Sequence, residues 1–280
     1  MSKKLGIIKF GKQLLKTGDL DPIYIMLHRA EMHENRLKRW MLAYWFFYHA
    51  GVASKLSGYR GSRFFEKAID LAQSKAKTPR GTERRHFRGE ACIKSLEFFH
   101  EAYSNPEDAV DHVTRHAAGV QDVLLFVKKR WPLFGPWIGF KIADMLERLD
   151  LREVEFSPAT LEMYSEPTKG AELVAQKYPE LWSDNQDDPP PSTTEVVELL
   201  MKKFRKFKAP PRYERPVNAQ EVETILCKWK SHLSGHYPMR KDTKEIYHAL
   251  KGWGEFAEHL QSVLATELFD GEDIGVALED

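Results

Sequence analysis

The stretch LFGPWIGFKIAD, residues 133–144, decides how the fold of this 280-residue chain is interpreted. The spacing of apolar residues predicts one helix before it, at 120–131, and another at 138–149. The connection at 132–137 combines Pro and Gly and interrupts the helical pattern. A glycine turn that opens a helix directs backbone amides and the positive end of the helix dipole at a bound phosphate. The stretch therefore predicts a helix–hairpin–helix that grips a DNA backbone. The turn residues expected nearest the phosphate are Gly135, Trp137 and Gly139.

The rest of the chain is also interpreted as helical. Apolar residues recur at helical spacing, and no long stretch of period 2 indicates strands. Capping boxes mark helix starts at Ser192 with Glu195 and at Asn218 with Glu221. The fold class is therefore predicted to be mainly α.

Composition places the chain among folded proteins without a membrane span. Hydrophobic residues make up 42% and charged residues 30%, enough apolar chain for a core. The formal net charge is only +1, so a nucleic-acid-binding face would have to be locally basic. Cys92 and Cys227 match no disulfide framework, which fits a reducing cytoplasm. No apolar run approaches the ~20 residues that span a bilayer, so we expect a cytoplasmic protein with no membrane partner.

The expected domain organisation is a single helical domain over residues 1–280. Two helical lobes, about 1–186 and 192–266, form the other arrangement, joined by a Pro-rich connection at 187–191 that cannot continue a helix. Residues 267–280 are acidic and are interpreted as a tail.

The sequence indicates neither a cofactor nor a metal. Walker, Rossmann and HExxH motifs are absent. His112 and His116 are spaced to share a helix face, but no third ligand is evident. We therefore assign no metal ligands and no cofactor, and the sequence leaves open a divalent metal that helps to bind pyrophosphate.

The segment RRHFRG, residues 84–89, is a candidate phosphate site. Arginine donates paired N–H groups to phosphate oxygens, and His86 can transfer a proton near neutral pH. The arginines concerned are Arg84, Arg85 and Arg88. A solvated charge run ahead of a helix would have the same composition.

The segment at 235–242 is a second candidate. Arg240 and Lys241 come directly before a predicted helix start, where anions are favoured. The alternative interpretation is a capped surface turn, with Asp242 as the cap.

Residues 137–144 resemble the turn and helix of the helix–hairpin–helix DNA glycosylases. Gly139 matches the second glycine of that family's Gly-x-Gly turn and Lys141 its catalytic lysine, whereas Trp137 replaces the first glycine. The family's catalytic aspartate is missing from the next loop, which carries Glu155. The resemblance implies a helical, glycosylase-like fold, and the missing aspartate argues against cleavage of the glycosidic bond.

Short motifs spread over most of the chain form a wider pattern. In order they are Asp21-Pro22-x-Tyr24, Arg39-Trp40, Tyr48-His49, residues 83–89, residues 134–144 and Tyr237-Pro238-x-Arg240-Lys241-Asp242. Together they resemble the phage amino acid:DNA transferases, also described as α-glutamyl/putrescinyl thymine pyrophosphorylases. The resemblance implies that an amino acid or polyamine displaces pyrophosphate from 5-pyrophosphoryloxymethyl-uracil in double-stranded DNA. The location would then be the host-cell cytoplasm.

That chemistry implies roles for the candidate residues. Cations must stabilise the leaving pyrophosphate, and the candidates are Arg84, Arg85, Arg88, Arg240 and Lys241. A base must deprotonate the amine, and the candidates are Asp144, Glu155 and His86. Lys141 would lie beside a modified base that has left the stack. An aromatic residue such as Trp137 or Phe87 would hold that base or fill the gap it leaves.

Two other functions fit the same residues. One is a DNA glycosylase or lyase with Lys141 as a Schiff-base nucleophile. The other is a non-catalytic DNA-binding module, which would show salt-sensitive binding and no chemistry.

Overall fold

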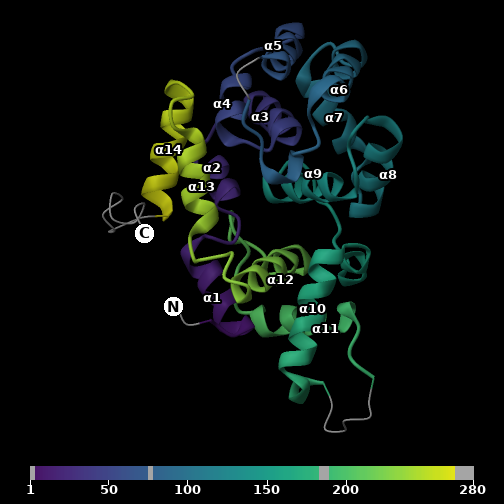
Figure 1. Cartoon of the computed structure of the whole chain (residues 1–280), viewed down its shortest axis with the longest axis vertical. Coiled ribbons are helices and arrows are strands. Elements are labelled where there is room, and N and C mark those ends of the chain that lie inside the picture. The colour runs from purple at the N-terminus through teal and green to yellow at the C-terminus, as the bar shows by residue number, and fades with distance from the viewer. Residues whose placement is uncertain (1–3, 75–77, 183–188, 269–280) are drawn as a thin grey trace. The chain divides into compact units, whose positions relative to one another are not determined.

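The computed structural model describes residues 4–74, 78–182 and 189–268, which are built from helices (Figure 1). The helices are α1 (Ile7–Thr17), α2 (Pro22–Arg29), α3 (Glu34–Phe47), α4 (Ala50–Leu56), α5 (Ser62–Gln73), α6 (Gly89–Ala102), α7 (Pro106–His116), α8 (Val120–Arg130), α9 (Pro136–Arg148), α10 (Ser165–Lys177), α11 (Thr193–Phe204), α12 (Ala219–Leu233), α13 (Lys241–Leu250) and α14 (Glu255–Leu268). Short 3-10 turns occur at Thr82–Arg84, Pro158–Met163 and Pro179–Leu181. An isolated antiparallel bridge joins Lys208 and Pro216. The predicted mainly α class is confirmed.

The chain divides into two compact units, and neither is continuous in sequence. The α12 unit consists of residues 1–25 and 155–243, and the α3 unit of residues 26–154 and 244–280. The expected division into contiguous lobes stays a prediction. Residues 187–188 of the Pro-rich connection and 269–280 of the acidic tail lie outside the described residues.

The α3 unit is organised around a helix that is buried on nearly all sides. α3 packs on α4, α7 and α9, and Trp45, Phe46 and Phe47 are fully buried. A helix that is apolar around its circumference belongs in the centre of a unit. The Phe46 ring contacts the Phe87 and Phe134 rings at centroid distances of 5.8 and 6.0 Å. One aromatic core therefore anchors both the basic segment around Phe87 and the hairpin around Phe134.

The α12 unit packs α1, α10 and α11 around α12. Close helix approach depends on small residues, since a Cβ at Gly170 would lie 3.0 Å from the Leu226 Cβ. Trp229 on α12 is fully buried and donates its indole N–H to the Leu5 carbonyl at 2.9 Å. The predicted capping boxes at the starts of α11 and α12 are confirmed.

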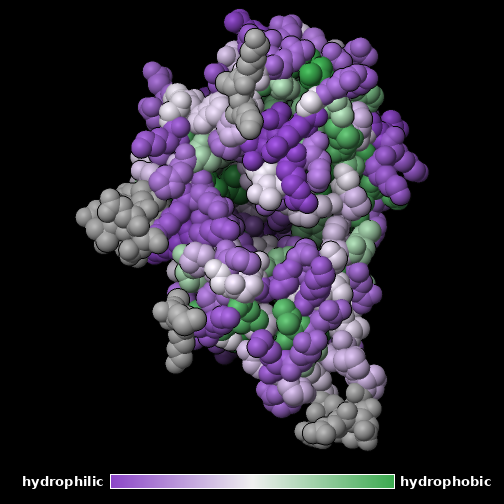
Figure 2. Space-filling model, in the orientation of Figure 1, coloured by the Kyte–Doolittle hydropathy of each residue, from purple (hydrophilic) through white to green (hydrophobic). Residues whose placement is uncertain are grey.

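The surface is polar over most of the face in Figure 2, where hydrophobic residues gather only in small groups. Large apolar side chains that are exposed are scattered, and include Leu125, Leu133 and Tyr213. None of the described helices has the length and apolar character needed to cross a bilayer.

His49 makes the stability of the α3 unit dependent on pH. Its Nδ1 accepts a hydrogen bond from the Val52 backbone N–H at 3.3 Å and so caps α4. Burial lowers the pKa of His49 from 6.5 to about 4. Between these values the unfolded chain binds a proton and the folded chain does not, so acid favours unfolding.

We expect the free energy of unfolding to fall by about 1–2 kcal/mol between about pH 6.5 and 4.5, since the ring is only partly shielded from solvent. In His49→Asn, the new side chain caps the helix without titrating. The fall in the free energy of unfolding over this pH range should therefore be smaller in the variant by about 1–2 kcal/mol. Urea unfolding at several pH values measures both proteins. Parallel pH profiles for the two would contradict the assignment.

Candidate active site

The two predicted helices are present as α8 and α9, with the turn 131–135 between them. We call this turn the hairpin; its membership of a helix–hairpin–helix fold stays a prediction. Side chains from elsewhere in the α3 unit hold it. Ser95 Oγ donates to the Pro132 carbonyl at 2.8 Å, and Arg84 Nη1 donates to the Leu133 carbonyl at 2.9 Å. Leu133 has a φ of 64° and is 45% exposed, in a region that non-glycine residues seldom occupy. Hydrogen bonds from Ser95 and Arg84 therefore fix the backbone of the turn, and Leu133 at its tip faces solvent.

The two glycines of the hairpin have different positions. Gly135 precedes α9 with extended backbone, and a Cβ there would meet nothing within 4 Å. Pro136 opens the helix, where no N–H is needed. Gly139 is buried, and a Cβ there would lie 2.7 Å from Leu124 Cδ2. Gly139 thus lets α8 and α9 pack closely. Gly135 and half-buried Trp137 form the accessible part of the predicted phosphate-binding turn.

Lys141, Asp144 and Arg148 form an ion cluster on α9. Lys141 Nζ lies 3.3 Å from Asp144 Oδ2, and Arg148 Nη1 lies 3.8 Å from Asp144 Oδ1. The side chains of Asp144 and Arg148 are 2% and 1% exposed, whereas that of Lys141 is 12% exposed. Lys141 is therefore the member that can reach a substrate, and Asp144 is placed to orient it.

Three aromatic rings in contact join the end of α3 to the start of α9. Tyr44 and Tyr48 rings lie 4.4 Å apart, and Tyr48 meets Trp137 edge to face at 5.1 Å. Burial raises the pKa of Tyr44 well above its usual value; Tyr48 and Glu83 add to the rise and Lys141 opposes it. These groups are therefore electrostatic neighbours. Lys141 therefore lies near Tyr44, whose ring contacts the Tyr48 ring.

Arg84 is enclosed by the hairpin and the aromatic core. Its Nε donates to the Phe46 carbonyl at 3.1 Å, and its guanidinium lies 4.3 and 4.8 Å from the ring centres of Phe87 and Phe134. Burial lowers the pKa of Arg84 to about 10. Its Nη2 is buried with no hydrogen-bond partner among the described residues. Arg84 therefore positions the hairpin from within the core.

The remaining basic residues of the segment lie on the surface. Arg85, His86 and Arg88 are exposed, and Arg85 Nη1 makes a long hydrogen bond of 3.4 Å to the Thr82 carbonyl. The predicted phosphate run thus separates into one buried arginine and three side chains accessible to a ligand.

Replacing Arg84 should destabilise the protein because lysine cannot reproduce the fork that reaches two carbonyls. We expect Arg84→Lys to lower the free energy of unfolding by about 1.5–3 kcal/mol, and the exposed Arg85→Lys to change it little. Urea denaturation followed by circular dichroism gives both values. Equal stability of the two variants would show that the hairpin does not depend on Arg84.

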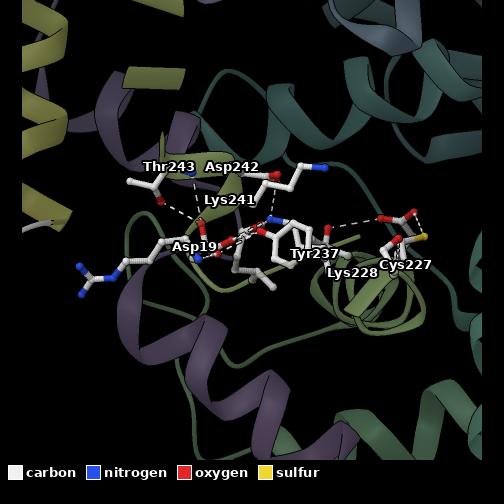
Figure 3. Close-up of polar contacts among 12 residues, drawn as sticks. Asp19, Cys227, Lys228, Tyr237, Lys241, Asp242 and Thr243 are labelled. Carbon is white, nitrogen blue, oxygen red and sulfur yellow. Dashed lines mark hydrogen bonds and ion pairs between the residues drawn. The ribbon is translucent and has the colours of Figure 1, made fainter. Parts of the chain in front are cut away.

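Glu155, Arg240 and Lys241 belong to the α12 unit. Glu155 is exposed, and Arg240 and Lys241 are half-buried. The N-terminus of α13 already receives a carboxylate, because Asp19 accepts the Arg240 and Thr243 backbone N–H groups at 2.6 and 3.3 Å (Figure 3). Any anion held by Arg240 or Lys241 would therefore have to contact their side chains.

Beside Asp19, a buried cation is held by oxygen atoms (Figure 3). Lys228 Nζ donates to the Asp19 and Leu20 carbonyls at 2.7 Å each and lies 2.6 Å from Asp242 Oδ2. Burial opposes the charge on Lys228, but Asp242 and Asp19 hold its pKa above the usual value. Burial raises the pKa of Asp19, and Lys228 opposes that rise. The ammonium group of Lys228 and its three oxygen acceptors are thus paired within the unit, which identifies this cluster as structural.

The sequence pattern alone missed Tyr44 and Glu83 as neighbours of Lys141. The available signal was the pair Tyr44 and Tyr48, one helical turn apart at the end of an aromatic helix. Among the described residues, no group of three or more His, Cys, Asp or Glu side chains is placed to hold a metal ion.

Comparison with known proteins identifies the family. Residues 15–238 match the family described as amino acid:DNA transferase. The chain belongs to this family. It is 41% identical to a glycinyltransferase of Pseudomonas phage PaMx11, with 93% of this chain and 95% of that protein covered. It is also 29% identical to a putrescinyltransferase of Delftia phage PhiW-14, with coverages of 94% and 85%. The predicted membership and transferase class are confirmed, and with them a role in modifying DNA.

Proposed function

We propose that this amino acid:DNA transferase joins a primary amine to 5-pyrophosphoryloxymethyl-uracil in double-stranded phage DNA. The amine nitrogen forms a bond to the 5-methylene carbon, the C–O bond breaks with its electrons going to pyrophosphate, and the nitrogen loses a proton. The supporting observation is membership of the family, together with relatives named for glycine and putrescine, which both carry a primary amine. Such DNA would be modified in the host-cell cytoplasm.

The α3 unit supplies groups suited to each part of this reaction. The open turn at Gly135 would receive a DNA phosphate. The edge-to-face pair of Trp137 and Tyr48 would hold the modified base outside the stack. Lys141, oriented by Asp144, would stabilise negative charge developing beside that base.

The surface residues of the basic segment suit the leaving group. Exposed Arg85 and Arg88 would bind the departing pyrophosphate, and His86 would accept the proton of the amine. From the α12 unit, the side chains of Arg240 and Lys241 are proposed as further pyrophosphate contacts. Exposed Glu155 is the alternative base.

The test is to incubate the protein with duplex DNA carrying 5-pyrophosphoryloxymethyl-uracil and single amines, and to analyse nucleosides by mass spectrometry. Glycine is the first amine to test, because the relative with 41% identity is a glycinyltransferase. We expect an aminated nucleoside and pyrophosphate in equal amounts. Unchanged DNA with every amine would refute the proposal. Release of the free base, or an adduct trapped by borohydride, would support a glycosylase instead.

A further inference from the structure

A dense group of positive charges lies at the end of α11 and directly after it. The segment 202–213, KKFRKFKAPPRY, contains no acidic residue. Its cations are Lys202, Lys203, Arg205, Lys206, Lys208 and Arg212. In a chain with a net charge of only +1, this segment is a marked local excess.

The first four of these cations point into solvent from a fixed base. Phe204 in their midst is fully buried, which anchors the end of α11. The side chains of Lys202, Lys203, Arg205 and Lys206 are exposed, and none has an acidic partner among the described residues. Their charge is therefore uncompensated in the α12 unit.

Backbone hydrogen bonds join the two halves of the segment that follows α11. The Ala209 N–H donates to the Arg215 carbonyl at 2.9 Å, and the Val217 N–H donates to the Phe207 carbonyl at 3.1 Å. These bonds close a short loop between residues 207 and 217. Lys208 therefore extends the charged surface from an ordered backbone. Lys208 Nζ reaches the Glu214 carbonyl at 3.0 Å, which fixes its direction.

A depression lies among the cations of α11. Its volume is about 270 Å³, and its walls are Leu199, Lys202, Lys203 and Arg205. A concave surface lined by charges of one sign strengthens the local potential and concentrates ligands of opposite charge. The surface is thus shaped as well as charged.

We propose that residues 202–208, the α11 basic surface, bind the phosphate backbone of double-stranded DNA. The complementary charge favours this partner, because duplex DNA carries one negative charge per about 1.7 Å of its axis. Lysine and arginine contacts to phosphate fix a protein on the duplex without reading sequence. The proposal rests on DNA being the substrate, as in the proposed function, and it adds a DNA-binding surface on the α12 unit.

The test compares two variants that lose the same charge. K202Q/K203Q/R205Q/K206Q neutralises the surface, while R60Q/R63Q/R115Q/K251Q removes exposed cations scattered over the α3 unit. Fluorescence anisotropy measures binding of unmodified duplex DNA at about 50–200 mM salt. The slope of log K against log salt should fall by about 3–4 for the surface variant, and its affinity at about 100 mM salt should fall at least about tenfold. The variant R60Q/R63Q/R115Q/K251Q should retain most of the salt slope and most of the affinity.

Three outcomes would overturn the proposal. Equal losses in the two variants would make the four cations an ordinary solvated face. Unchanged duplex binding in the surface variant would likewise show that the four cations do not bind DNA. A loss confined to RNA of the same length would assign the surface to another polymer. Thermal unfolding confirms that each variant is folded. Because the duplex carries no modified base, a wild-type protein that binds it through this surface but transfers no amine would contradict only the proposed function.

Discussion

Replacing Lys141 with methionine is expected to slow amine transfer at least about 100-fold under single-turnover conditions. Removing one preorganised group that stabilises developing charge costs about 10²–10³ in rate in well-studied enzymes. Methionine keeps the length of the side chain and removes only its charge. Asp144 retains Arg148 as a partner 3.8 Å away, so the buried carboxylate is not left alone. The loss should therefore be in chemistry and not in folding.

The controls separate charge from position. Lys251→Met removes an exposed lysine of the same unit and should leave the rate unchanged. Asp144→Asn keeps the shape of the positioning residue and should slow transfer less than Lys141→Met does. Thermal unfolding and duplex binding are measured for all variants. If folded Lys141→Met protein transfers amine at more than a tenth of the wild-type rate, Lys141 has no central role and the arginines must carry the charge.

Local sequence signals predicted α8, α9 and the turn between them. The apolar spacing on both sides of residues 131–135 and the Gly-Pro pair are contained in one stretch, and α8 and α9 occur where they indicate. The capping boxes at Ser192 and Asn218 were predictable for the same reason, since both partners lie within one helical turn.

Burial by distant segments was not visible in the sequence. Arg84 and Arg85 are adjacent in sequence, yet Arg84 is buried against Phe87 and Phe134 and Arg85 is exposed. Gly139 matches a family turn glycine, but its role is set by Leu124 on another helix. Neither distinction follows from spacing, because both depend on which side chains the tertiary fold brings together.

Asp19 shows the same limit at longer range. Asp19 lies shortly before α2, which begins at Pro22, and an Asp near a helix start can cap that helix. In the structure its carboxylate instead accepts hydrogen bonds at the start of α13, where Thr243 is 224 residues away. A cap supplied from so far along the chain joins two segments of the α12 unit, and this makes its loss costly.

Asp19→Ala is expected to lower the free energy of unfolding by about 3–5 kcal/mol, because each buried donor left without its acceptor costs about 1–3 kcal/mol. The side chain is fully buried and accepts hydrogen bonds from Tyr237 Oη at 3.0 Å, Arg240 N at 2.6 Å and Thr243 Oγ1 at 2.8 Å. Alanine would leave these donors without an acceptor and take one carboxylate away from Lys228.

Asp19→Asn keeps an acceptor oxygen and the volume of the side chain, so its loss of stability should be intermediate. Glu90→Ala, which breaks an exposed ion pair with Lys94, should have little effect. Urea denaturation at neutral pH orders the three variants. Stability of Asp19→Ala within about 1 kcal/mol of wild type would mean that the cluster does not hold the α12 unit together, because a buried carboxylate with this many donors cannot be removed so cheaply if its bonds persist in the folded protein.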